Sequence, residues 1–306
     1  MRKSLFLCVM FVCAAASLVF AQDTSVNVSS FSIPELAAIP VIDGDISDGA
    51  WESIPWMAVS EDGDPPGNPA PPEAGNLDVQ MKAAWDDETN AVYFAFHIID
   101  DVFINEYGRG SSAGGNGWKH ESLEVVFNAE NTGSSADGEG SDHHAQYTFQ
   151  FPNTIDDQPL GIGDLDVSTD FISLPVFEGI DGHFAGEEPT FDIDNNFVES
   201  AGMLRATKAG EPAWEGSPVE FYFEFKIVPF SILKGSLDDA ENVVKDLEAL
   251  DVIGIDPCMN DSDSYSGDRE WRVNLSGTGA GWNSSAELVG MILEAAQTPV
   301  NNWSMY

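Results

Sequence analysis

Alternation of apolar and polar residues with a period of two is the feature that most constrains the fold. In the clearest run, PVEFYFEFKI, the apolar residues from Val219 to Ile227 share one face and the polar residues share the other. Similar runs occur at NAVYFAFHII, SLEVVFN and AQYTFQF. Successive side chains of a strand point to opposite faces, so each run predicts a strand with one buried face. Gly-rich turns separate the runs, and together they predict an all-β, antiparallel β-sandwich of roughly eight to ten strands.

Three segments interrupt this pattern. Residues 152–217 are weakly periodic and acidic, and we interpret them as a long insertion with a few short strands. The run EDGDPPGNPAPPEAG is a second loop, because proline removes the donors that a sheet needs. The segment SLDDAENVVKDLEAL, approximately residues 236–250, opens with Ser236 and Asp239 in capping-box spacing and carries an apolar stripe. It predicts one short accessory helix.

The first 21 residues have the pattern of a secretory signal peptide. Arg2 and Lys3 precede a short apolar run, and small residues near its end predict cleavage near Ala21–Gln22. No later segment is long and apolar enough to span a bilayer. We therefore expect residues 22–306 to form a single domain that is secreted, extracellular or periplasmic.

Charge limits the partners. The chain has 12 Lys and Arg against 52 Asp and Glu, a formal charge of -40 that becomes -42 without Arg2 and Lys3. A chain this acidic lacks the basic patch that phosphate contacts need, which excludes nucleic acid and anionic membranes. Neutral ligands and cations suit it better.

Acidic loops supply candidate calcium ligands. Asp43, Asp45 and Asp48 form one group, and Asp100 and Asp101 form another. Further acidic pairs are Asp86 with Asp87 and Asp261 with Asp263. Calcium takes several oxygen ligands from short loops, so we expect calcium as a cofactor. The alternative is a solvated acidic surface, since such groups also arise from composition alone.

Six segments in order resemble a known family. They are VIDGDISDGAW, MKAAWDDETNAVYFAFHIIDD, NGWKHESLEVVFNAEN, FYFEFKIVPFSIL, IGIDPCMNDSDSYSGDREW and GWNSSAELVGMIL. Together they are similar to the family 9 carbohydrate-binding modules and to the related DOMON-like sugar-binding domains. The resemblance implies a jelly-roll sandwich that binds a sugar without cleaving it, with calcium ions bracing its loops.

The resemblance also implies a sugar site. Trp118 and Trp282 fall at two positions whose rings clamp a sugar, and Glu124 matches a carboxylate that accepts hydrogen bonds from its hydroxyls. Pyranose C–H groups stack on aromatic rings, while hydroxyl groups at the edge need polar partners.

Four more residues complete the predicted ligand-binding set. Asn260 and Asp261 are expected at the rim of the site, and Gln146 and Trp271 on or beside its strands. The polar shell departs from the family, because Cys258 and Thr148 stand where members have a glutamine and an arginine. The resemblance therefore implies an aromatic clamp whose glycan is not transferable from relatives.

Three residues are expected to be structural. Trp51 and Trp85 fall at core positions of the family pattern, and large aromatic side chains are usually buried. Cys258 is the only cysteine after residue 21, which excludes an intramolecular disulfide, and we expect it to be buried.

Catalysis is not indicated. No pair of carboxylates can be singled out for glycoside hydrolysis, and no HExxH motif is present. We expect a binding protein for polysaccharides or oligosaccharides that acts alongside separate glycoside hydrolases in polysaccharide breakdown. One alternative is a haem-binding electron-transfer domain with ligands such as His97 and Met259. Another is an acidic cell-surface or matrix protein that assembles with calcium.

Overall fold

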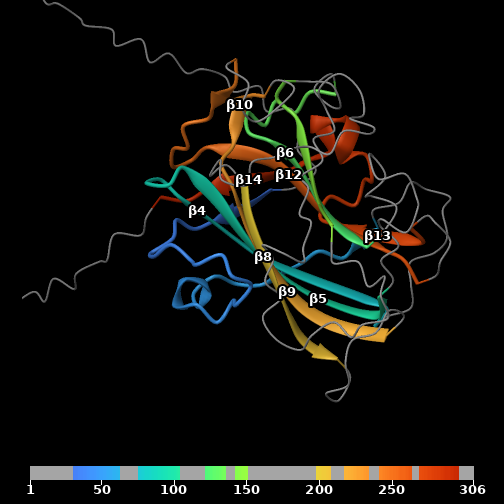
Figure 1. Cartoon of the computed structure of the whole chain (residues 1–306). Helices are drawn as coiled ribbons and strands as arrows, with labels where there is room; N and C mark the ends of the chain where they lie inside the picture. Colours follow the sequence, from blue (N-terminus) through green and yellow to red (C-terminus); the bar gives the residue numbers. More distant parts are fainter. Residues whose placement is uncertain are drawn as a thin grey trace, which may run out of the picture.

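The computed structural model describes residues 30–62, 75–103, 121–135, 142–150, 198–207, 217–233, 241–263 and 269–295. Side chains are described throughout these ranges except at residues 148–150, 198–207, 217 and 282. Most of the described residues lie in the strands of two facing sheets, shown in Figure 1. No helix among the described residues has the length and hydropathy of a membrane span.

The first sheet has five antiparallel strands in the order β2-β4-β5-β9-β8. Their bounds are β2 Met57–Ala58, β4 Leu77–Asp86, β5 Ala91–Phe103, β9 Ser217–Ile227 and β8 Val198–Thr207. The periodic runs predicted β5 and β9. The edge strand β8 lies within the predicted insertion over 152–217, which was expected to contain short strands, and it pairs along β9.

The second sheet has seven strands, with β12 at its centre. Their bounds are β1 Ser30–Ile33, β3 Glu61–Asp62, β6 Ser122–Asn128, β7 Ala145–Gln150, β12 Val252–Asp261, β13 Trp271–Asn274 and β14 Val289–Leu293. One edge of β12 pairs with β6, and its other edge pairs first with β14 and then with β13. The strand β1 pairs with β14 in parallel, whereas the other pairs are antiparallel.

The main core lies between the two sheets, as the alternation predicted. Phe94, Phe96 and Phe225 are fully buried, with ring centroids of Phe225 4.9 Å from Phe94 and 5.7 Å from Phe96. The facing sheet contributes Leu123 and Met259. The predicted all-β sandwich is confirmed.

A second apolar cluster covers the outer face of the five-stranded sheet. Trp51, at the end of a 3-10 turn (η1, Gly49–Trp51), is fully buried there against small residues such as Ala95. Its indole N–H donates to Glu224 at 2.6 Å, and the Lys82 ammonium donates to its carbonyl at 2.7 Å. Trp85 lies in the main core. The predicted burial of both tryptophans is confirmed.

The accessory helix predicted over 236–250 is wrong for the described residues 241–250. Val243 and Val244 form the strand β11, which pairs with β10 (Phe230–Ile232). Leu247 is buried and its N–H donates to the Asn90 side chain at 2.8 Å. Leu250 is 74% exposed, with a φ of 77°. Within residues 241–250, the apolar stripe therefore consists of one buried leucine, Leu247, and of exposed residues, and it is not the face of a helix.

Candidate functional site

Polar residues line the outer face of the seven-stranded sheet. They occupy the positions that alternate with core residues: Glu124 on β6 lies between Leu123 and Val125, which point into the core. Glu124 is in register with Cys258 on β12, and the Gln146 amide on β7 donates to its carboxylate at 2.7 Å. Side chains of the same kind continue along this face, and we call it the polar face: Ser122, Glu124, Gln146, Cys258, Asn260 and Arg272.

Two arginines belong to this region, and sequence reasoning missed both. The Arg269 guanidinium donates to the Asn260 side chain at 3.3 Å, and Asn260 in turn donates to Ser122 at 3.0 Å. Arg272 lies opposite Asn260 on β13. Burial raises the pKa of the Cys258 thiol to about 12, and the positive charges of Arg272 and Arg269 oppose that rise. The polar face therefore has cationic donors although Thr148 replaces the expected arginine.

Cys258 is buried in this face as a free thiol, as predicted. Its raised pKa favours the protonated thiol at neutral pH, which is consistent with a small buried side chain.

The predicted aromatic clamp is described only in part. Trp282 lies in a 3-10 turn (η5, Gly281–Asn283), which contacts the outer side of β12 at Asp256. The Trp282 side chain and the whole of Trp118 lie outside the described residues. The paired rings remain a prediction.

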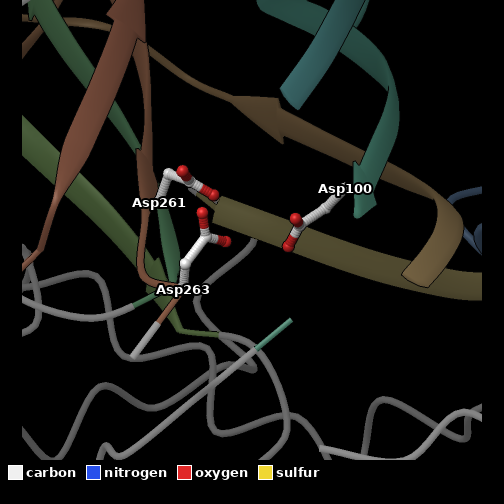
Figure 2. A group of neighbouring side chains, drawn as sticks. All are labelled: Asp100, Asp261 and Asp263. Carbon is white, nitrogen blue, oxygen red and sulfur yellow. The ribbon is translucent and has the colours of Figure 1, made fainter. Parts of the chain in front are cut away.

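Carboxylates gather at a second place, between the ends of the two sheets. Figure 2 shows Asp100, at the end of β5, facing Asp261 and Asp263 at the end of β12. One carboxylate oxygen of each residue lies within 4.8 Å of the others. Asp100 and Asp261 are buried, and Asp263 is half-buried. Three like charges this close, in a site of low dielectric, require a cation or protons.

Glu121 extends this cluster, which we call the acidic cluster. It is fully buried, and one of its carboxylate oxygens accepts the Ser262 N–H at 2.8 Å. Burial and the neighbouring carboxylates raise its pKa well above its usual range. The same causes raise the pKa of Asp100 to about 7 and that of Asp261 to about 8.

Buried oxygens without a hydrogen-bond partner show whether a metal ion would fit the acidic cluster. Among the described residues, one buried oxygen of each of several side chains has no hydrogen-bond partner: Asn76, Asp100, Glu121, Asp261 and Asp263. Asn76 belongs to the same place, because its amide donates to Asp263 at 2.7 Å. Buried oxygens are normally paired, and carboxylate and amide oxygens are the ligands that calcium takes. The acidic cluster therefore fits a hard divalent cation.

The sequence did contain a signal for this cluster. Each of three acids takes the next core-facing position in an apolar series: Asp100 after Ile98, Asp261 after Met259 and Glu121 before Leu123. Each of three strands has a carboxylate in place of a core residue near one end. This pattern predicts that the carboxylates lie close together.

Two predicted sugar ligands are corrected by this geometry. Asp261 and Trp271 are in register on β12 and β13, so their side chains share one side of the sheet. That side faces the interior, where Trp271 packs in the main core and Asp261 joins the acidic cluster. Neither belongs to the polar face, because the sheet has a period of two and Asn260 points the other way.

The other predicted metal ligands lie elsewhere. Asp101 is exposed and lies outside the group of three, although its charge helps to raise the pKa of Asp100. In the N-terminal segment, Asp43 accepts the Asp45 N–H at 2.8 Å, and Asp45 accepts the Ser47 N–H at 3.1 Å. Asp48 accepts the Val41 N–H at 2.9 Å. These carboxylates brace turns, and their role as metal ligands remains a prediction.

The two residues named as haem ligands, His97 and Met259, do not lie together. His97 lies on the outer face of the five-stranded sheet, where its ring stacks on Tyr222 at 4.6 Å and one nitrogen lies 2.8 Å from Glu220. Met259 is fully buried between the sheets. Side chains on opposite sides of a sheet cannot ligate one iron.

Residues 42–161 match a family model described as "Carbohydrate family 9 binding domain-like". The predicted resemblance to family 9 is confirmed. The fold is similar to that of a family 9 module from Caldicellulosiruptor kristjanssonii in complex with glucose, at 16% identity and a TM-score of 0.51, covering 89% of this chain and 100% of that chain. A structure of a family 9 module from the same organism with cellotriose gives 15% identity and a TM-score of 0.50, covering 90% of this chain and 100% of that chain. At these identities the likeness to family 9 structures establishes the fold alone. The curated proteins gave no match.

Proposed function

We propose that this chain is an exported, non-catalytic carbohydrate-binding protein whose site is the polar face together with the Trp282 turn. The observation that carries the proposal is the Glu124–Gln146 pair on the outer face of a sandwich similar to those of family 9, where the turn of Trp282 contacts β12 at Asp256. Structures with this fold hold glucose and cellotriose, which makes a neutral saccharide the ligand to test.

Each group on the face has a role that suits a polyhydroxyl ligand. Glu124 accepts hydrogen bonds from vicinal hydroxyls, while Gln146 holds its carboxylate in place. Asn260 and Arg269 offer an amide and a guanidinium beside it. The indoles of Trp118 and Trp282 stack on the apolar side of the sugar. Such a site binds without chemistry, and the protein would supply ligand recognition to separate glycoside hydrolases.

Calcium would serve as a structural ion in this proposal. Asp100, Asp261 and Asp263 would hold it, with Glu121 and Asn76 beside them. When bound, the ion neutralises carboxylates that otherwise repel one another. It would link β5 of one sheet to β12 of the other, so its contribution is to stability.

Titration calorimetry with cellotriose, followed by a glycan array, tests the binding function. We expect Glu124→Gln and Trp282→Ala each to lower affinity for the glycan that binds, by about tenfold or more. The first variant loses a hydrogen bond to a charged group, and the second loses the stacking of an aromatic ring. The Tm of both variants should stay close to that of the wild type.

Lys226→Gln is the matched control, because Lys226 lies on β9 in the other sheet. Its affinity should equal that of the wild type. Absence of binding to every glycan, with and without calcium, would refute the proposed function. Light scattering that rises on addition of calcium, without glycan affinity, would favour the matrix-protein alternative.

A further inference from the structure

A single carboxylate organises the turn that leads to Trp282. One oxygen of Asp256 accepts the N–H groups of Leu275 at 3.2 Å and Ser276 at 2.9 Å. Its other oxygen accepts the Ser276 hydroxyl at 2.8 Å and the Asn274 amide at 2.9 Å. Asp256 lies on the outer side of β12 and is only 3% exposed. A buried carboxylate that accepts four hydrogen bonds fixes the groups that donate them.

An arginine holds the same turn from the neighbouring strand. Arg272 on β13 donates from its guanidinium to the carbonyl of Gly279 at 2.5 Å. Gly277 and Gly279 have φ values of 70° and 65°, which only glycine adopts without strain. The turn is therefore fixed at its N–H groups by Asp256 and at a carbonyl by Arg272.

Gly281, the residue before Trp282, packs closely against Asp256. A Cβ placed on Gly281 would lie 2.9 Å from a carboxylate oxygen of Asp256 and 3.1 Å from the side chain of Leu288. Real Cβ atoms do not approach so closely, so the backbone at residue 281 rests directly on the Asp256 carboxylate. The Asp256 carboxylate therefore supports the backbone directly before Trp282.

We propose that Asp256 and Arg272 are positioning residues for the sugar site, which fix the turn of residues 275–281 and thereby the backbone of Trp282 before ligand binds. This inference rests on the proposed function of the polar face. Fixing a binding residue in advance removes the cost of ordering it on association, so the pair raises affinity without contacting sugar. Neither residue was predicted from the sequence.

The variant that tests this is Asp256→Asn, which keeps the shape of the side chain. Its amide nitrogen cannot accept a hydrogen bond, so at least one of the four hydrogen bonds is lost together with the negative charge. Glu224→Gln is the matched control: Glu224 is also a buried carboxylate that accepts N–H groups from a loop, but it lies on the other sheet. Both variants should lower the Tm.

The decisive measurement is fluorine NMR of protein labelled with 5-fluorotryptophan, in which Trp282→Phe assigns the Trp282 signal. We expect Asp256→Asn to shift or broaden that signal in sugar-free protein and to lower cellotriose affinity by about tenfold or more. Glu224→Gln should change neither. Asp256→Asn with a wild-type Trp282 signal and wild-type affinity would refute the proposal, even with a lowered Tm.

Two milder variants serve if Asp256→Asn fails to fold. Gly281→Ala inserts the Cβ that meets Asp256, and Arg272→Gln removes the bond to Gly279. Each should move the Trp282 signal, and an unmoved signal in both refutes the proposal. If the wild type binds neither cellotriose nor any arrayed glycan, the proposed function fails, while the Trp282 signal still decides whether Asp256 positions the turn.

Discussion

The two outer faces of this sandwich differ in what covers them. On the five-stranded sheet, the Trp51 indole fills the space above Ala95, and Glu224 accepts its N–H together with the N–H of Gly44. On the seven-stranded sheet, polar side chains such as Glu124 and Asn260 remain, and the covering turn is built from small residues. One face is thus covered by an aromatic side chain, and the other by buried polar side chains, which are the groups that the proposed function assigns to a polar ligand.

The largest effect should come from removing the Trp51 ring. Trp51→Ala leaves a cavity in the second apolar cluster and removes the indole donor from one oxygen of Glu224, so we expect a loss of about 3–5 kcal/mol in unfolding free energy. Urea unfolding measures it. Trp51→Phe, which keeps the ring but loses the N–H, should lose less. A loss below about 1 kcal/mol for Trp51→Ala would show that the outer face of the five-stranded sheet does not depend on this ring.

Calcium should give the next largest effect, because the acidic cluster joins the two sheets. Calcium at one hundred times its Kd would add about 2.7 kcal/mol to the unfolding free energy, so a chelator should lower the Tm. Asp261→Asn should abolish that response, whereas Asp48→Asn, in the N-terminal segment, should retain it. A full calcium response in Asp261→Asn would exclude the acidic cluster as the metal site.

An effect of intermediate size is expected in the pH dependence of stability, through Glu224 beneath Trp51. Burial raises the pKa of Glu224 from 4.5 to about 7, against the opposing hydrogen bond from Trp51. Between these values the folded protein holds a proton that the unfolded chain has lost, so this contribution to stability is lost as pH rises from 4.5 to 7. Glu224→Gln should therefore lose less stability than the wild type between pH 5 and pH 8, in urea unfolding with chelator present. An identical pH dependence in both proteins would contradict the raised pKa.

The smallest effect is expected in the exposed N-terminal turn. Asp48→Ala removes one exposed hydrogen bond to Val41, so we expect a loss of about 1 kcal/mol or less. Thermal unfolding with and without calcium checks it. A lost calcium response in this variant would assign a metal to the group of Asp43, Asp45 and Asp48.

Most of the fold could be predicted from the sequence because period-two alternation fixes which residues face the core. The strands around Phe94, Leu123 and Phe223 follow directly from it. The helix over 236–250 was wrong because an apolar stripe does not show whether its members meet a core, and Val243 and Val244 remain exposed. The position and length of the edge strand β8, within the insertion, were not predicted because its sequence, VESAGMLRAT, alternates weakly.

The candidate site was less predictable because it depends on pairing between distant strands. Glu124 and Gln146 could be placed by alternation and resemblance. Asp261 was assigned to the wrong side, since an acid is expected to face solvent, whereas here it faces other acids between the sheets. The role of Asp256 depends on a turn that begins about 20 residues later in the chain, and no local pattern predicts that contact.

The register between Trp271 and Asp261 would make Trp271 an optical probe of the proposed calcium site. Because the indole and the carboxylate lie side by side on the inner side of neighbouring strands, a terbium ion in place of calcium would accept excitation energy from the tryptophan. Green luminescence excited in the ultraviolet would then report occupancy of the acidic cluster directly, without any label.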